Sequence, residues 1–312
     1  MIASCRIVSV ESTDPYRNLA VEELLLKSVR DDELILYLWQ NDRTVVIGRN
    51  QDACHECDMD TLLSEGGRLA RRFSGGGAVY HDLGNVNFTF LSVKENYDIE
   101  RQNRVILEAV SAFGINAQCT GRNDLTVQER KFSGCAYYDD GRARFHHGTI
   151  LIDTDLGRMG RYLTPSKSKL SSKGVASVES RVICLSEISS DITPSKLKEV
   201  MTDAFLRNCR AAGSSVCGDD DLPFDSREIE TVRKRFADQS WILSRQISSS
   251  RTIEIRNAEG LFTCHLLVKG GMITDAEVFT DALDVGAAAL MKKKLVGRRY
   301  DRAEIEEYCR QS

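Results

Sequence analysis

The chain has 312 residues, of which 42% are hydrophobic and 28% charged, and its formal net charge is −4 at pH 7. This composition is typical of a folded, water-soluble protein, and the negative charge argues against general nucleic-acid binding, which needs a basic excess. No apolar run approaches the roughly 18 residues that span a bilayer, and no basic segment with an apolar core opens the chain, so we expect neither a membrane anchor nor a secretory signal but a cytoplasmic location.

The first half of the chain predicts strands and helices in mixed order, without a regular βαβ repeat. In sequence they are a strand to about Val10, a helix over 18–26 that begins near Pro15, strands over 34–39 and 44–47, a short helix over 59–64, and strands through Tyr80 and over 85–91. A helix from Asp98 to about Phe113 then stops at Gly114, and strands are expected over 125–127, 131–137 and 148–152.

A glycine-rich segment lies between the short helix and the strand at Tyr80. It reads Arg71-Arg72-Phe73-Ser74-Gly75-Gly76-Gly77. The glycines leave backbone N–H groups open to phosphate or carboxylate oxygens, and either arginine could add a charge-assisted fork. The segment lacks the Gly-Lys-Ser/Thr of a P-loop, and it leads into a strand instead of the helix of a dinucleotide site. On this motif alone, an anion site and an exposed turn both remain open.

A second group of polar residues follows, with Asp124, then Lys131, then His147-Gly148-Thr149. Each has a structural interpretation, as a turn, a surface lysine on an edge strand, or a histidine at the start of a strand. Together they suit the activation of an acid on ATP. A lysine cation can contact a carboxylate and an α-phosphate at once, and an aspartate could hold magnesium.

The ten cysteines are expected to be reduced, because disulfides are rare in chains without an export signal. Cys54-His55-Glu56-Cys57 is a CxxC motif with an internal histidine, but no second CxxC or histidine pair stands at zinc-finger spacing. We therefore favour a structural interpretation over a metal or redox role for Cys54 and Cys57.

The second half of the chain begins with a polar segment over 164–180, for which a solvated loop and a functional lid both remain open. Helices are expected over 195–210 and 228–236, with exposed connections at 211–215 and 219–221. A polar linker over 244–250 precedes a small α+β unit with strands over 252–256, 261–268 and 272–278 and two helices. Because the chain exceeds the usual single core, we expect two domains, 1–245 and 246–312.

In combination these motifs resemble the lipoate-protein ligase A family, and the resemblance runs from Asn18 to Asp281. It rests on the segment from Arg71 through His81-Asp82-Leu83-Gly84-Asn85, on Gly121-Arg122-Asn123-Asp124-Leu125, on Lys131-Phe132-Ser133-Gly134 and on His147-Gly148-Thr149. It implies an α+β fold, with a large mixed-sheet catalytic domain of the biotin and lipoate protein ligase type and a small accessory domain.

The resemblance also implies roles for individual residues. Lys131 would be the catalytic residue that contacts lipoate and the adenylate phosphate, and Asp124 would also hold Mg²⁺. The adenylate-binding loop would include Lys173, Gly174 and Val175, which favours the lid interpretation. The site for ATP and lipoyl-adenylate would comprise Arg72, Ser74, Gly75, Gly76, Gly77, Ala78, Val79, Tyr80, Asn85, Asp124, Lys131, Ser133, Gly134, His147, Gly148 and Thr149.

The implied reaction has two steps, in which lipoate and Mg-ATP give lipoyl-AMP and the lipoyl group then passes to a lysine of an acceptor. The acceptors would be lipoyl-domain proteins, namely E2 subunits of 2-oxoacid dehydrogenases and the glycine cleavage H protein. We expect a monomer that binds neither nucleic acid nor membrane.

Three other functions remain open. An octanoyl transferase that draws on acyl carrier protein would need a cysteine, and the matching stretch Thr164-Pro165-Ser166-Lys167 has none, although Cys135 could be a substitute. A transferase that uses preformed lipoyl-AMP and a non-catalytic lipoate-binding protein are the others. The lysine and the lid segment are both present, so we favour the ligase.

Overall fold

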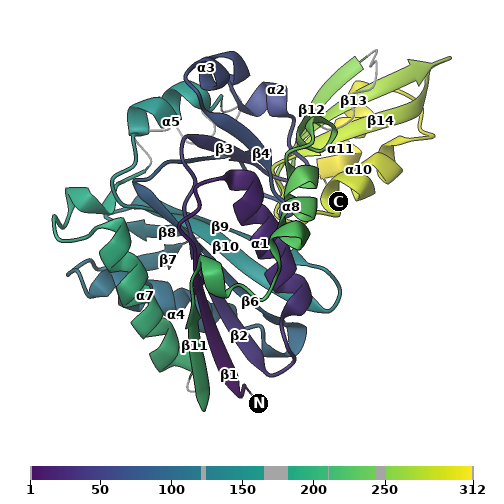
Figure 1. The fold of residues 1–312 in the computed structure, drawn as a ribbon. Coiled ribbons are helices and arrows are strands. Elements are labelled where there is room, and N and C mark those ends of the chain that lie inside the picture. Colours follow the sequence, from purple (N-terminus) through teal and green to yellow (C-terminus); the bar gives the residue numbers. More distant parts are fainter. Residues whose placement is uncertain (1, 121–123, 165–181, 210, 244–250, 311–312) are drawn as a thin grey trace.

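The computed structural model describes residues 2–120, 124–164, 182–209, 211–243 and 251–310. Its largest element is an eight-stranded mixed sheet in the order β11-β1-β2-β6-β10-β9-β8-β7 (Figure 1). The strands are β1 (Ser4–Ser9), β2 (Glu33–Trp39), β6 (Asn85–Val93), β7 (Gln118–Thr120), β8 (Asp124–Val127), β9 (Arg130–Asp139), β10 (Ala143–Leu151) and β11 (Gly213–Cys217).

Helices cover both faces of this sheet. One face packs against α4 (Ile99–Ser111) and α7 (Pro194–Cys209), and the other against α1 (Pro15–Ser28) and α8 (Ser226–Phe236). Strand β2 is apolar from Leu34 to Trp39 because both of its faces are buried. Its leucines at 34, 36 and 38 enter the first core, while Ile35, Tyr37 and Trp39 enter the second. A strand buried on both sides has no polar face to show in its sequence.

A second sheet before the C-terminal unit has three strands in the order β4-β3-β5. It comprises β3 (Thr44–Ile47), β4 (Arg68–Arg71) and β5 (Val79–His81). Its apolar side chains share a core with four short helices, α2 (Ala53–Glu56), α3 (Met59–Ser64), α5 (Leu156–Tyr162) and α9 (Gln239–Leu243). The connection from β4 to β5 is the glycine-rich segment, so the prediction that it joins two strands is confirmed.

The C-terminal unit has its own antiparallel sheet and its own core, and Figure 1 shows it in yellow at one side of the molecule. It consists of β12 (Arg251–Arg256), β13 (Leu261–Lys269), β14 (Met272–Thr280), α10 (Ala287–Leu295) and α11 (Arg302–Arg310). Its residues 280–285 contact the part of the chain that precedes it. The backbone N–H of Thr280 donates to the Asn50 carbonyl at 2.6 Å, and Asn50 Nδ2 donates to the Val285 carbonyl at 2.9 Å.

The predicted α+β class is confirmed, and so are most of the predicted elements. One prediction was wrong, because part of the expected connection at 211–215 belongs to the edge strand β11, which pairs in parallel with β1. Its first residues, Gly-Ser-Ser, are small, polar and exposed, so the sequence has no alternating pattern that would predict a strand. Backbone pairing with β1 forms the strand. The proposed boundary at 245/246 falls on residues outside the described ranges and stays a prediction. None of the helices described is long and apolar enough to cross a membrane.

Candidate active site

One row of cross-strand neighbours forms the floor of the site on the α1 face of the large sheet. Trp39 of β2 pairs with Asn87 of β6, Asn87 with Thr149 of β10, Thr149 with Gly134 of β9, and Gly134 with Asp124 of β8. Directly opposed residues in antiparallel strands point to the same face, and neighbouring strands lie about 4.8 Å apart. The row therefore leads from an indole to a carboxylate over about 19 Å.

The glycine-rich segment lies over this floor and is wrapped around the guanidinium of Arg72. The Arg72 side chain donates to the carbonyls of Gly75 and Gly77 at 2.7 and 2.8 Å, to the Val46 carbonyl at 3.0 Å, and to Ser74 Oγ at 3.0 Å. Burial lowers the pKa of this guanidinium to about 10, and Glu22 opposes that shift. Arg72 thus fixes the course of the segment and still lines the cavity beneath it.

Arg71 has a different role from its neighbour. Within the described residues its buried guanidinium donates only to backbone carbonyls, those of residues 48, 49 and 51 and those of residues 241 and 242 in α9. With its donors taken up in this way, Arg71 ties α9 to the segment that leads to Asn50. The sequence left either arginine open as the anion ligand, and only Arg72 faces the site.

A chain of buried side chains connects Arg72 to helix α1. Ser74 Oγ accepts from Arg72 and lies 2.7 Å from His147 Nε2, while His147 Nδ1 lies 2.8 Å from Glu22 Oε1. Because the Glu22 carboxylate only accepts, His147 carries a proton on Nδ1, and in the neutral ring Nε2 accepts from Ser74 Oγ. Glu22 also accepts from Thr89 Oγ1 at 2.7 Å, which in turn accepts from Trp39 Nε1 at 3.1 Å. One carboxylate therefore orients both the glycine-rich segment and the indole.

Lys131 and Asp124 meet at the other end of the floor. Lys131 Nζ lies 2.6 Å from Asp124 Oδ1, and both side chains are about one-third exposed. Gly134 makes this position possible, because a Cβ there would lie 2.7 Å from Lys131 Nζ. The lysine cation is thus held over the mouth of the site and remains accessible from solvent.

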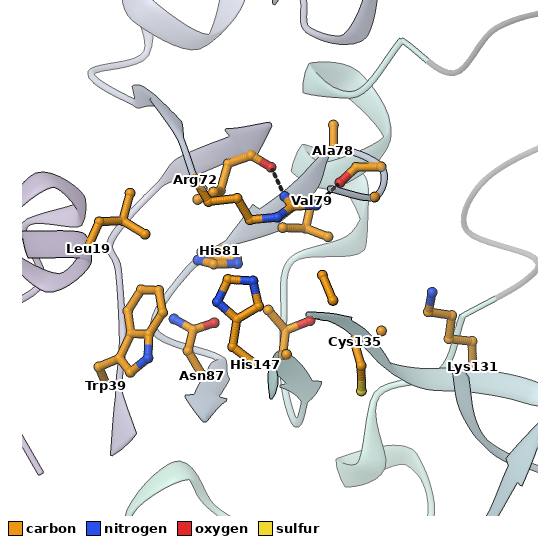
Figure 2. Close-up of a pocket in the computed structure, with 17 residues that line it drawn as sticks. Leu19, Trp39, Arg72, Ala78, Val79, His81, Asn87, Lys131, Cys135 and His147 are labelled. Carbon is orange, nitrogen blue, oxygen red and sulfur yellow. Dashed lines mark hydrogen bonds between the residues drawn. The ribbon is translucent and has the colours of Figure 1, made fainter. Parts of the chain in front are cut away.

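Between these parts lies a cavity with about 610 Å³ of empty space, open solvent at its mouth included (Figure 2). It brings together ten of the predicted residues, namely Arg72, Gly76, Gly77, Ala78, Val79, Lys131, Gly134, His147, Gly148 and Thr149. The N–H groups of Gly77 and Ala78 donate to no backbone oxygen within the described residues, and they stand where an anion could accept from them.

Six predicted residues lie outside the cavity lining. Asp124 reaches it only through Lys131, Ser74 Oγ is hydrogen-bonded to Arg72 and His147, and Gly75 packs against the carbonyls of Ala282 and Leu283. Tyr80 packs in the core under the small sheet, Asn85 donates to Asn87, and Ser133 Oγ lies 3.9 Å from Cys135 Sγ. Lys173, Gly174 and Val175 fall outside the described residues, as does the expected lid beyond residue 164.

Sequence reasoning missed several residues that line the cavity. These are Leu19, Trp39, Val46, His81, Asn87 and Ala136, with Glu22 behind them. Asn87 carried a usable signal, since it is a polar residue inside an otherwise apolar predicted strand. For the others, burial in the core and exposure to the cavity look alike in the sequence.

Cys135 and Cys57 bear on two alternatives raised by the sequence, an acyl-transfer cysteine and a metal site. The Cys135 side chain packs into the core on the α4 face, Figure 2 shows its sulfur turned away from the cavity, and burial raises its pKa to about 12. It is therefore poorly suited as an acyl-accepting nucleophile. Cys57 is buried in the core beneath the small sheet, and in the described part of the chain no three His, Cys, Asp or Glu side chains gather at a site for a metal ion.

Comparison with known proteins places this geometry among related chains. Residues 14–206 match the family described as lipoyl protein ligase A/B catalytic domain, and residues 249–312 match the bacterial lipoate protein ligase C-terminus. The crystal structure of Plasmodium falciparum LipL1 in complex with lipoate is 28% identical, with a TM-score of 0.82 over 99% of this chain and 100% of that one.

Two further structures share the fold. A bipartite lipoate protein ligase from Thermoplasma acidophilum, described with its E2 lipoyl domain, is 24% identical, with a TM-score of 0.66 over 80% of this chain and 100% of that one. A lipoate-protein ligase A bound with ATP is 23% identical, with a TM-score of 0.63 over 78% of this chain and 99% of that one.

Proposed function

Because the chain belongs to the lipoyl protein ligase A/B catalytic domain family, whose members are enzymes, we propose that it activates lipoate with ATP and transfers the lipoyl group to a lysine of an acceptor protein. One observation carries this proposal. The cavity has a deep, largely apolar end at Leu19 and Trp39 and an open end where Lys131 and the glycine-rich segment face the same space. A carboxylic acid with an apolar tail fits that polarity.

In the first step, a carboxylate oxygen of lipoate attacks the α-phosphorus of ATP, and the bond to the bridging oxygen of the β-phosphate breaks to release pyrophosphate. Both reactants are anions, so their approach needs a cation between them. Lys131 supplies that charge, and the N–H groups of Gly77 and Ala78 stabilise the charge that develops on the phosphate oxygens. Arg72 keeps those N–H groups in place by binding the carbonyls of the same segment.

Asp124 fits a supporting role for Mg²⁺. A magnesium ion at a nucleotide is commonly held by one or two protein carboxylates together with phosphate oxygens, and it neutralises part of the phosphate charge. The Asp124 carboxylate is one-third exposed beside Lys131, which leaves its second oxygen accessible. Asp124 would thus orient the lysine with one oxygen and face the metal with the other.

In the second step, the amine of an acceptor lysine attacks the carbonyl carbon of lipoyl-AMP, loses a proton and releases AMP. We propose that the acceptors are lipoyl domains of E2 subunits and the glycine cleavage H protein. The Thermoplasma ligase, which has this fold, is described together with its own E2 lipoyl domain, and that pairing supports this class of acceptor. The exposed mouth at Lys131 leaves room for a lysine side chain to approach.

Incubation of the protein with lipoate and Mg-ATP tests the first step. We expect mass spectrometry to detect lipoyl-AMP, and addition of an E2 lipoyl domain to convert it into a lipoylated domain and AMP. Omission of ATP should abolish the product. Lipoylation that needs preformed lipoyl-AMP, with none made from lipoate and ATP, would contradict activation and leave transfer alone.

A further inference from the structure

The His81 imidazole, which lines the cavity beside Trp39, has a ring N–H that no described residue accepts. Its Nδ1 lies 3.0 Å from Asn41 Nδ2, and the orientation of that amide is set because Asn41 Oδ1 accepts from Asn18 Nδ2 at 3.0 Å. Nδ1 therefore accepts, and the proton of the neutral ring sits on Nε2. The ring is 3% exposed, and its Nε2 has no partner among the described residues.

Asn87 presents a second unused donor on the floor of the same cavity. The backbone N–H of Asp82 donates to Asn85 Oδ1 at 2.8 Å, so Asn85 donates its Nδ2 to Asn87 Oδ1 at 3.0 Å. This leaves the Asn87 Nδ2 group as a donor. The side chain is 1% exposed, and Nδ2 finds no acceptor in the described part of the chain.

Both donors lie at the end of the cavity that would hold the tail of an acyl substrate. The His81 ring meets the Trp39 ring edge-on with centroids 6.0 Å apart, and Asn87 is the direct cross-strand neighbour of Trp39. Asn87 is two strands from Gly134, a separation of about 10 Å. Figure 2 shows Lys131 at one side of the cavity and Trp39, Asn87 and His81 toward the other.

We propose that His81 Nε2–H and Asn87 Nδ2–H are specificity-determining donors that pair with the sulfur atoms of a dithiolane tail and disfavour a tail made only of carbon. The proposal rests on the proposed function, since it takes a lipoate-like acid as the occupant. Divalent sulfur accepts hydrogen bonds weakly, whereas a hydrocarbon tail accepts none. Both donors are buried without a partner in the empty protein, so a sulfur atom that reaches them gains a hydrogen bond, whereas a carbon tail leaves them unpaired.

Binding of two ligands of nearly the same shape tests this directly. Lipoate and 5-cyclopentylpentanoate differ only in two sulfur atoms replaced by CH₂ groups. We expect calorimetry on the full chain to give a dissociation constant about tenfold or more lower for lipoate. Octanoate, measured in parallel, should bind at least as weakly as the cyclopentyl acid. Equal affinity of the wild-type protein for lipoate and the cyclopentyl acid overturns the proposal, without any variant.

His81→Phe and Asn87→Leu then assign the preference to the two donors. Each removes one N–H and keeps a side chain of similar size, and each should reduce the ratio of the two affinities to about threefold or less. Val46→Ala is the matched control, because it loosens the same cavity without touching a donor and should leave the ratio unchanged. Loss of affinity for both acids by the same factor in His81→Phe and Asn87→Leu would show a merely structural role.

Failure of this inference can be told from failure of the proposed function. If lipoate is preferred over its carbocyclic analogue but no lipoyl-AMP forms with Mg-ATP, the roles of the two donors are supported and the proposed activation of lipoate is wrong. If lipoyl-AMP forms but both acids bind equally, only the donor assignment is wrong.

Discussion

The backbone N–H of Gly76 donates to the carbonyl oxygen of Ala282 at 2.8 Å, so a residue of the C-terminal unit occupies a donor of the glycine-rich segment. Gly76 has a φ of 87°, a conformation that favours glycine, and its neighbour Gly75 lies so close that a Cβ there would collide with the carbonyls of Ala282 and Leu283. The segment proposed to bind phosphate is therefore also the docking surface of the C-terminal unit.

Gly75→Ala should undock the C-terminal unit. Its methyl group would meet two backbone carbonyls that have no room to retreat while the unit stays docked. We expect a larger radius of gyration by small-angle scattering. Gly77→Ala is the matched control, because a Cβ at Gly77 has no atom of the described residues within 4 Å, and it should leave the radius unchanged. An unchanged radius for Gly75→Ala would show that the contact yields without undocking.

Lys131→Ala should abolish formation of lipoyl-AMP and leave the fold intact. Removal of a preorganised charge at a reacting phosphate slows a reaction by about 10²- to 10³-fold. The pair with Asp124 is about one-third exposed and contributes only about 0–1 kcal/mol to stability. Lipoate-dependent pyrophosphate exchange and a thermal melt separate the two effects, with Lys293→Ala as an exposed-lysine control. Near-normal exchange would remove Lys131 from the mechanism.

Ser74→Ala should weaken both stability and ATP binding, because Ser74 Oγ joins Arg72 to His147 in the interior. The loss leaves two buried groups without a partner and should lower the free energy of unfolding by about 1–3 kcal/mol. Ser92→Ala offers a matched control. Ser92 is equally buried, but its Oγ has no hydrogen-bond partner among the described residues, so urea unfolding should show little change.

Stability should fall as the pH drops below about 6.5, partly through His146. Burial lowers the pKa of this ring to about 3, with the nearby His147 as the lesser cause. Between pH 6.5 and about 3 the unfolded chain binds a proton that the folded ring does not, so acid favours unfolding by about 1.4 kcal/mol per pH unit for this group. His146→Phe should flatten the dependence of unfolding free energy on pH, measured by urea titration. An unchanged slope would contradict the burial argument.

The sequence by itself predicted most of the elements and the candidate reacting groups. Alternation and glycine punctuation predicted β3 and α3 at their observed bounds, and most other elements within a few residues. The glycine-rich segment, Lys131 and His147 were visible because their residue types are unusual where they stand. The sequence did not predict β11, because its small polar residues show no alternating pattern and form a strand by pairing with β1.

The tertiary structure decided which of these residues meet. Arg71 and Arg72 are adjacent and chemically equal in the sequence, yet one binds carbonyls of α9 and the other faces the cavity. The row from Trp39 through Asn87, Thr149 and Gly134 to Asp124 depends on strand order and register, which periodicity leaves open. The two-residue period of a strand predicts which face of the sheet a side chain occupies. Its neighbours on that face depend on strand order and register, which form only in the folded sheet.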